Sequence, residues 1–415
     1  MSHASHTFVV GAGIVGLCCA IELRRRGLPV TVLDRLEPGH GCSWGNAGIL
    51  SARSVVPIGM PGMLRRLPQM LFGREGPLVI RWRSLPHTAR WLWLLQRSAT
   101  LAQVRRTARA MNQLYGSSVE LHRALAHEAG VPELVSAAPG LYVHRDATGT
   151  DLQSLAWSLR REHGAHLELL EGAALHEAEP ELSPDYRRGL RMGPMGHTVN
   201  PLRLTQAYAA LLQRMGGSIV RGELRALQPT AEGVSLFTEG ATLQADAVVL
   251  AAGAWTAPLL RPLGWKLPLI AERGYHLSFA EPGLTLKHVV SEGGAHVAVG
   301  SMEGGLRIAG TEEIGLADDA PAWHRAELLR GIAQRMFPKA RLGQASRWMG
   351  PRPGTPDSLP LIGALPGQPR LYVAAGHGHL GLTGAPHTGQ LIAALLCGEM
   401  PGIELAPYGP GRFGS

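Results

Sequence analysis

The hydrophobic pattern near the amino end predicts a strand, a helix and a second strand. Residues 8–10 are continuously apolar, which is typical of a short strand buried on both faces. Apolar positions then recur with a helical period over residues 14–26, and Gly27 follows as a helix stop. A second apolar run covers residues 30–33. This order predicts a βαβ unit whose two strands are parallel.

The turn before the predicted helix carries a recognisable spacing of glycines. Gly11, Gly13 and Gly16 match the pattern G-x-G-x-x-G, which permits a tight turn and the close approach of a pyrophosphate at the helix amino end. Asp34 follows the second strand, where an acid accepts hydrogen bonds from a ribose 2′-hydroxyl. The glycines alone would also fit an unrelated α/β turn. Together with the strand context and the acid, they predict a dinucleotide site.

Other segments predict further strands and one amphipathic helix. Alternating or continuous apolar runs bounded by turn residues predict strands, and a helical period that ends at Gly164 predicts a helix over residues 150–164. No internal repeat or low-complexity tract is present. The strand segments are residues 140–146, 165–172, 218–227, 233–253 and 306–313.

Composition narrows the class of protein. The chain has 415 residues, enough for two domains, and no apolar run reaches the roughly 18 residues of a membrane helix. The formal charge is +8, but the basic residues are spread along the chain and match no nucleic-acid-binding module, so we expect no nucleic-acid partner. The four cysteines form no CxxC pair and the amino end lacks a basic signal region. These features predict a cytoplasmic protein.

Five further motifs occur downstream of the glycine turn, and they carry a family resemblance. With these motifs the chain resembles the amino-acid oxidase superfamily of flavoproteins, and most closely its FAD-dependent D-amino-acid dehydrogenases, including those acting on D-hydroxyproline. The resemblance extends over almost the whole chain. The motifs are GCSWGNAGIL (41–50), DAVVLAAGAWT (246–256), RGYHL (273–277), GPRPGTPDSLPLIG (350–363) and AAGHGHLGLTGAP (374–386).

The resemblance implies an α/β fold with two interleaved domains. A discontinuous Rossmann-like FAD-binding domain would comprise residues 1–58, 197–265 and 350–415. An α+β substrate domain with a mainly antiparallel sheet would comprise residues 59–196 and 266–349. The active site is then expected between the domains, a usual location for a ligand cleft.

The same resemblance implies noncovalent FAD and its contacts. Small residues and backbone amides would line the pyrophosphate and the flavin, and a helix amino end would stabilise negative charge at N1 and O2 of the reduced ring. Leu224 would meet the adenine through its backbone. An isolated H-x-H at His377 and His379 is poor evidence for zinc, so no metal is expected. The expected cofactor residues are Gly11, Gly13, Gly16, Asp34, Arg35, Ser43, Asn46, Ala47, Gly48, Leu224, Gly253, Trp255, Gly381, Leu382 and Thr383.

Three residues are candidates for the substrate side. Arg352 lies in the arginine-proline motif, and its guanidinium fork suits a substrate carboxylate. Tyr275 could donate to the same carboxylate, and an ordinary strand tyrosine is the alternative. His377 could approach the substrate or simply pack. Arg53 is a weaker candidate, for which a solvated charge is the favoured interpretation. No general base is visible in the sequence, so the substrate is expected to react as the free amine.

The predicted reaction is the oxidative deamination of a D-amino acid by hydride transfer to flavin N5, giving an imine. A cyclic substrate such as cis-4-hydroxy-D-proline fits the resemblance. One alternative is a glycine or sarcosine oxidase that uses oxygen, and another is a flavin-binding subunit of a hetero-oligomeric dehydrogenase. The electron acceptor would be a quinone or another carrier. Side-chain selectivity is expected in residues 51–74.

A tryptophan- and arginine-rich segment, residues 77–110, has two interpretations. Trp82, Trp91 and Trp93 alternate with arginines, as in segments that lie at lipid headgroups. Internal packing is the favoured alternative. The lipid interpretation would add peripheral contact with the inner face of the membrane and a route for electrons to a membrane quinone.

Overall fold

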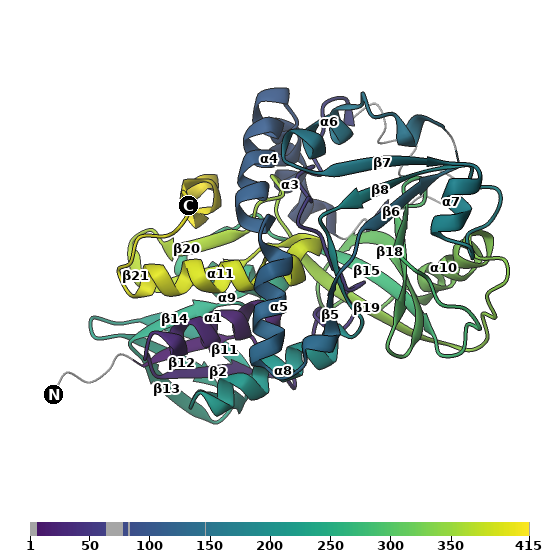
Figure 1. Cartoon of the computed structure of the whole chain (residues 1–415). Helices are drawn as coiled ribbons and strands as arrows, with labels where there is room; N and C mark the ends of the chain where they lie inside the picture. Colours follow the sequence, from purple (N-terminus) through teal and green to yellow (C-terminus); the bar gives the residue numbers. More distant parts are fainter. Residues whose placement is uncertain (1–5, 64–77, 82–83, 146, 415) are drawn as a thin grey trace.

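Two large β-sheets organise the described part of the chain in the computed structural model (Figure 1). A six-stranded sheet lies among the helices that are labelled α1, α8 and α11, and a nine-stranded sheet lies beside it with α10. Both termini lie on the side of the six-stranded sheet (Figure 1). The structure describes residues 6–63, 78–81, 84–145 and 147–414.

The predicted βαβ unit is present. It consists of β1 (Thr7–Val10), α1 (Ile14–Arg25) and β2 (Val30–Asp34), and the two strands are parallel neighbours. Val9 packs among the helices on one face of the sheet, whereas Phe8 and Val10 pack on the other face. Burial on both faces explains why the strand is continuously apolar.

The six-stranded sheet is assembled from distant segments, in the order β10-β2-β1-β14-β21-β20. All neighbours are parallel except β20 and β21. Helices cover one face, and a three-stranded antiparallel sheet packs on the other. This arrangement confirms the Rossmann-like part of the predicted fold. The added elements are α8 (Pro201–Arg214), β10 (Ser218–Arg221), β11 (Leu224–Pro229), β12 (Val234–Thr238), β13 (Ala241–Ala245), β14 (Ala247–Leu250), α9 (Thr256–Leu260), β20 (Leu361–Leu365), β21 (Gln368–Ala375) and α11 (Gly381–Leu396).

The nine-stranded sheet is mainly antiparallel, as predicted. Parallel pairs occur between β16 and β6 and between β18 and β4. Helix α10 (Trp323–Met336) covers one face, where its apolar side chains pack against Leu277 and Phe279. The strands are β4 (Leu78–Ile80), β6 (Gly140–His144), β7 (His166–Glu171), β8 (Arg188–Gly193), β15 (Ile270–Phe279), β16 (Val289–Glu292), β17 (Val297–Met302), β18 (Gly305–Gly315) and β19 (Ala345–Gly354).

The predicted domain boundaries differ from the structure in two places. Strand β19 remains paired in the large sheet as far as Gly354, so a boundary at residue 350 divides a strand. Helices α4 (Leu101–Tyr115) and α5 (Ser118–Glu128) were expected in the substrate domain. They pack instead in the core of α1, α8 and α11, because their apolar stripes face those helices. The predicted helix is α6 (Leu155–Glu162), and α7 (Ala173–Ala178) follows it.

The tryptophan-rich segment forms β4 and α3 (Leu85–Ser98). Trp91 is buried, and its indole nitrogen donates to the carbonyl of Gly354 at 3.1 Å. Trp93 is 56% exposed and stacks with the guanidinium of Arg97. Trp82 lies outside the described residues, and so do residues 64–77, which include part of the segment expected to set side-chain selectivity. No helix in the described part of the chain is long and apolar enough to span a bilayer.

Candidate active site

The turn between β1 and α1 requires glycine at both of its ends. Gly11 has φ of 116°, and a Cβ there would lie 2.4 Å from the carbonyl oxygen of Ala251. A Cβ at Gly16 would lie 1.9 Å from the carbonyl oxygen of Gly11. The backbone amide of Ala12 donates to Asp34 Oδ2 at 2.6 Å, so Asp34 is held at the end of β2 beside this turn. The turn and the acid therefore meet as the sequence predicted.

Further expected cofactor residues gather around this turn. Ser43 Oγ accepts from the amide of Ile14 at 3.0 Å, at the amino end of α1. The Arg35 guanidinium lies 4.4 Å from the ring centroid of Trp255. Gly253 has φ of 57° just before this tryptophan. Leu224 is buried at the start of β11 and packs in the core, as expected of its side chain.

The segment from Ser43 to Gly48 is tied to the large sheet. Arg307 of β18 donates through Nη1 to the carbonyls of Asn46, at 2.8 Å, and Trp44, at 3.1 Å. Burial lowers the pKa of Arg307 to about 10. Asn46 Oδ1 in turn accepts from the amide of Gly48 at 2.8 Å, which fixes Ala47 between them. The two sheets are thus joined by the segment that is expected to line the flavin.

The amino end of α11 reaches the same place. Thr383 accepts from the amide of Ser51 at 3.2 Å and donates to the carbonyl of Ile49 at 3.3 Å. The carbonyl of Leu382 accepts from His122 Nε2 at 2.7 Å. Gly381 is the first helical residue, and the first turn contains no acid. The glycine turn and the amino ends of α1 and α11 suit the phosphates and the flavin of FAD, and the acid at the end of β2 suits a ribose hydroxyl.

Arg352 lies across the large sheet on the side of these flavin segments. On β19 it is directly opposite Glu272 of β15. Its guanidinium lies over Gly274, where a Cβ would be 1.8 Å from Nη2. Nη1 is 3.4 Å from Glu312 Oε1, and the side chain is 23% exposed. This placement leaves the fork able to receive a carboxylate.

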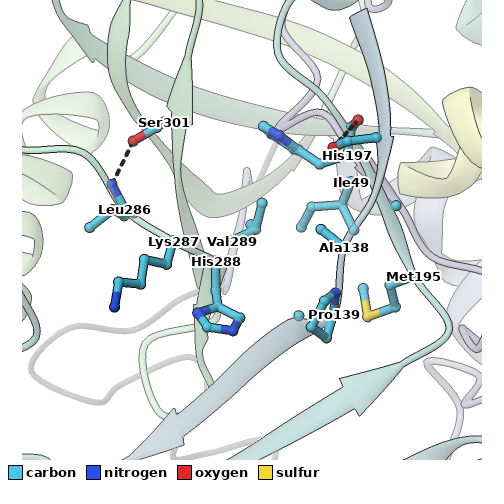
Figure 2. A pocket seen from close by; sticks show the side chains of 13 residues that line it. Ile49, Ala138, Pro139, Met195, His197, Leu286, Lys287, His288, Val289 and Ser301 are labelled. Carbon is cyan, nitrogen blue, oxygen red and sulfur yellow. Dashed lines mark hydrogen bonds between the residues drawn. The ribbon is translucent and has the colours of Figure 1, made fainter. Parts of the chain in front are cut away.

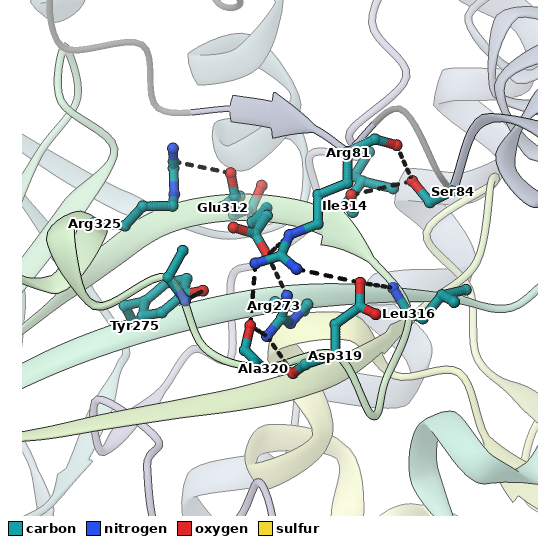
Figure 3. Close-up of polar contacts among 12 residues, drawn as sticks. Arg81, Ser84, Arg273, Tyr275, Glu312, Ile314, Leu316, Asp319, Ala320 and Arg325 are labelled. Carbon is teal, nitrogen blue, oxygen red and sulfur yellow. Dashed lines mark hydrogen bonds and ion pairs between the residues drawn. The ribbon is translucent and has the colours of Figure 1, made fainter.

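Tyr275 does not lie beside Arg352. Its hydroxyl accepts from the backbone amide of Ala322 at 3.0 Å, and its ring packs edge-on against Trp323. Figure 3 shows Tyr275 among the polar residues near Arg273 and Arg325. Successive strand side chains point to opposite faces, so Tyr275 shares the face that α10 covers. The prediction that its phenol assists Arg352 is wrong because closeness in sequence did not mean a shared face.

His377 lines a cavity between the large sheet and the turn before α11. Its Nε2 is 2.9 Å from Thr388 Oγ1, and burial lowers its pKa to about 3. The imidazole is therefore neutral. Glu272, Ser358 and His379 line the same cavity, which holds about 300 Å³ of space, part of it open to solvent. His377 therefore packs against α11 and also faces a cavity, and its approach to the substrate stays a prediction.

Arg53, the weaker substrate candidate, lies against a helix. Its Nη1 donates to Asn112 Oδ1 of α4 at 3.1 Å. The favoured interpretation of a solvated charge is therefore wrong for this side chain. Its partner is an amide of the same protein, which indicates a role in packing.

Glu272 is a site residue that sequence reasoning missed. Its side chain is 3% exposed, and Oε2 has no hydrogen-bond partner among the described residues. Burial and, to a smaller extent, the charge of Glu312 raise the pKa of Glu272 to about 8, and Arg352 acts in the opposite direction. Only the strand register places it opposite Arg352.

A second cavity lies on the far side of the Ile49–Leu50 strand, β3. Together with β9 (Gly196–Thr198) and β5 (Val135–Ala137), this strand forms a small sheet. Figure 2 shows Lys287 and His288 across the cavity from Ile49 and Ala138. It holds about 460 Å³ of space, part of it open to solvent, and its lining contains a lysine and two histidines but no acid.

The fold and the cradle define a flavoprotein oxidoreductase with a site between two sheets. The chain belongs to the FAD-dependent oxidoreductase family, because the family model described as "FAD dependent oxidoreductase" matches residues 6–395. Its cofactor is FAD.

Individual proteins agree with this assignment. The chain is 39% identical to a D-amino-acid oxidase of Bradyrhizobium diazoefficiens, over the full length of both chains. It is 32% identical to a D-amino acid dehydrogenase of Methylobacterium radiotolerans, covering 98% of this chain and 99% of the relative. A glycine oxidase structure from Geobacillus kaustophilus superposes with a TM-score of 0.76 at 23% identity, covering 98% and 99% of the two chains.

Proposed function

We propose that this enzyme oxidises a D-amino acid at its α-carbon, giving an imine that hydrolyses to a 2-oxo acid or cyclises. The observation that carries the proposal is Arg352, whose side chain is 23% exposed and has one half-exposed partner, Glu312, on the face of the large sheet that we expect to face the flavin. The names of the relatives support a D-amino acid as the substrate class.

Each part of the site has a task in this proposal. The Arg352 fork holds the substrate carboxylate through two charge-assisted bonds and so fixes the α-carbon. The amino end of α11, where Thr383 is anchored to Ile49 and Ser51, places positive partial charge beside the flavin. The large sheet closes the opposite side of the site. Bound FAD supplies the acceptor for the α-hydrogen and its electron pair.

The substrate and the acceptor define two further choices. The resemblance to D-hydroxyproline dehydrogenases makes cis-4-hydroxy-D-proline our first candidate among cyclic substrates, with glycine or sarcosine as the alternative. The relatives include both an oxidase and a dehydrogenase by name, so oxygen and a quinone are the acceptors to compare. Contact between the exposed Trp93 and a membrane would favour the quinone. A non-catalytic flavin subunit would not need the carboxylate site that Arg352 forms.

The test is an anaerobic bleaching screen of the FAD-loaded protein. Absorbance of the oxidised flavin is followed after addition of D-proline, cis-4-hydroxy-D-proline, D-alanine, their L-isomers, glycine or sarcosine. We expect bleaching by at least one D-isomer and slower or no bleaching by its L-isomer. Reoxidation on admission of air, compared with reoxidation by a soluble quinone, identifies the acceptor. A yellow protein that no amino acid bleaches would refute the proposed function.

A further inference from the structure

Glu272 occupies an unusual position for a carboxyl group. It lies on β15, the strand next to β19 at the edge of the large sheet, is 3% exposed, and has one oxygen with no partner in the described part of the chain. A buried polar atom without a partner costs about 1–3 kcal/mol, so a ligand that bonded to it would recover that cost. The unpartnered oxygen faces the cavity between the large sheet and the turn before α11, because a Cβ at Gly378 would lie 3.7 Å from it.

Two charged groups and two histidines surround Glu272 on its face of the sheet. Arg352 lies directly opposite on β19, and Glu312 lies beyond Gly274 on β18. His377 and His379 face the cavity from the turn before α11, and burial lowers the pKa of both. On its own strand, Arg273 points to the other face and is bonded there to Glu313. A cation for the substrate carboxylate and a buried acid therefore lie side by side.

We propose that Glu272 contacts the substrate α-ammonium group and accepts its proton, so that Arg352 and Glu272 together receive the two charged ends of an amino acid. The proposal rests on the proposed function. It adds the general base that the sequence did not reveal, and it restricts the substrates to amino or imino acids whose nitrogen is next to the carboxylate-bearing carbon.

In the proposed step a proton moves from the substrate ammonium to Glu272. The N–H bond of the ammonium breaks, its proton forms an O–H bond with Glu272 Oε2, and the electron pair stays on nitrogen as a lone pair. Bound FAD would supply the acceptor for the α-hydrogen and its electron pair, which are the two electrons that the substrate loses as the nitrogen lone pair forms the C=N bond. Glu272 later returns the proton to water.

The first test is the pH dependence of Glu272→Gln. General-base catalysis contributes on the order of 10²-fold, so we expect kcat/KM at pH 8 to fall by about that factor. The loss should shrink to less than about tenfold at pH 10, because more of the substrate is then already the free amine. In the wild type, the profile of kcat/KM against pH should have an inflection near pH 8. In Glu272→Gln this inflection should move towards the pKa of the substrate ammonium. A loss that is equal at every pH, or no loss, would overturn the proposal.

The second test measures binding without turnover. Benzoate has a carboxylate and no amine, and its binding is followed by the change in flavin absorbance. In the wild type, ionised Glu272 should repel it, so affinity should fall by about tenfold between pH 7 and pH 9. Glu272→Gln should bind benzoate equally at both pH values. If benzoate affinity depended on pH equally in the wild type and in Glu272→Gln, the placement of Glu272 beside the bound ligand would be contradicted.

The chain offers a matched control. Glu179 is also a fully buried acid, and it too has an oxygen without a partner among the described residues. It accepts from the amides of Lys287 and His288 rather than facing Arg352. Glu179→Gln should keep the wild-type pH profile and benzoate binding. A shift in this control equal to that of Glu272→Gln would attribute the effect to general destabilisation and overturn the proposal.

Two further results separate the alternatives. If Glu272→Gln does not retain FAD, Glu272→Asp is the second variant. It should keep the inflection of kcat/KM near pH 8 with a lower rate. Loss of that inflection would count against Glu272 as the general base. If Glu272 instead held a cationic side chain, Glu272→Gln would slow only D-arginine and D-lysine and leave D-alanine unchanged. Wild-type flavin that no amino acid bleaches would refute the proposed function itself, which is a different outcome from an unchanged variant.

Discussion

The two faces of the large sheet use the same kinds of residue for different purposes. Arg273 and Glu313 are paired on the face that α10 covers, and both are almost fully buried. Both terminal nitrogens of Arg273 are bonded, one to Glu313 and the other to the carbonyls of Asp319 and Ala320 (Figure 3). Arg81 adds a second cation at 2.9 Å from Glu313.

The opposite face is left incomplete. Arg352 is partly exposed and 3.4 Å from Glu312, and Glu272 keeps an oxygen without a partner among the described residues. Removal of one partner from a completed buried pair leaves an uncompensated charge, whereas an incomplete pair can receive a ligand. The comparison indicates that charge content alone does not identify a site. An unpartnered atom alone does not identify one either, since Arg273 Nε and Glu179 Oε1 are also buried without a partner among the described residues. Glu272 differs because its unpartnered oxygen faces a cavity and lies on the same face of the sheet as the partly exposed Arg352.

Arg352→Met should have the largest effect and act only on substrate handling. Loss of a charged, hydrogen-bonded contact costs about 4 kcal/mol, or about 10³-fold in kcat/KM. The melting temperature and FAD content should be nearly unchanged, because the nearby carboxylate of Glu312 is 41% exposed. Steady-state kinetics and thermal unfolding measure the two effects. Unchanged substrate affinity would remove Arg352 from the proposed carboxylate site.

Arg273→Met should produce the reverse pattern. Breaking a buried ion pair costs about 3 kcal/mol in the free energy of unfolding, whereas kcat/KM of the folded fraction should stay within about twofold because Arg273 points away from the cavity. Denaturant titration measures the loss. Arg188→Met, which removes an exposed pair with Glu171, is the control and should cost less than about 1 kcal/mol.

Gly274→Ala tests whether the position of the guanidinium matters. The new Cβ would lie 1.8 Å from Arg352 Nη2, so the end of this flexible side chain must move. A misplaced carboxylate contact should raise KM by about tenfold, with little change in stability. Gly304→Ala, in the turn between β17 and β18, where a Cβ would meet open space, is the control. Equal KM values in the two variants would show that the Arg352 guanidinium does not bind the substrate carboxylate from its position over Gly274.

Local pattern was enough to predict the nucleotide side of the molecule. The turn from Gly11 to Gly16 and the acid Asp34 belong to one short βαβ unit, in which sequence spacing fixes spatial distance. The interleaved order of the domains followed from the family resemblance. Helices α4 and α5 were assigned to the other domain, because an apolar stripe shows that a helix packs but not on what.

The substrate side depended on register, which the sequence does not show. Arg352 and Glu272 are separated by 80 residues and become neighbours only through the pairing of β15 with β19. The prediction for Tyr275 failed for the same reason. Without the register between β15 and β19, the sequence does not show whether Tyr275 and Arg352 point to the same face of the sheet. A strand's own period gives two faces, and only its partners decide which face carries the site.

Tyr275→Phe should have the smallest effect and decides whether the two faces are independent. The hydroxyl accepts from the amide of Ala322 on the face that α10 covers, so its removal should cost about 1 kcal/mol of stability. kcat/KM should stay within about twofold, and the pH profile should not change. If the phenol instead held the substrate carboxylate, kcat/KM would fall at least tenfold with unchanged stability. That result would mean that residues on the covered face of β15 reach the substrate, and the contrast between a completed face and an open one would no longer hold.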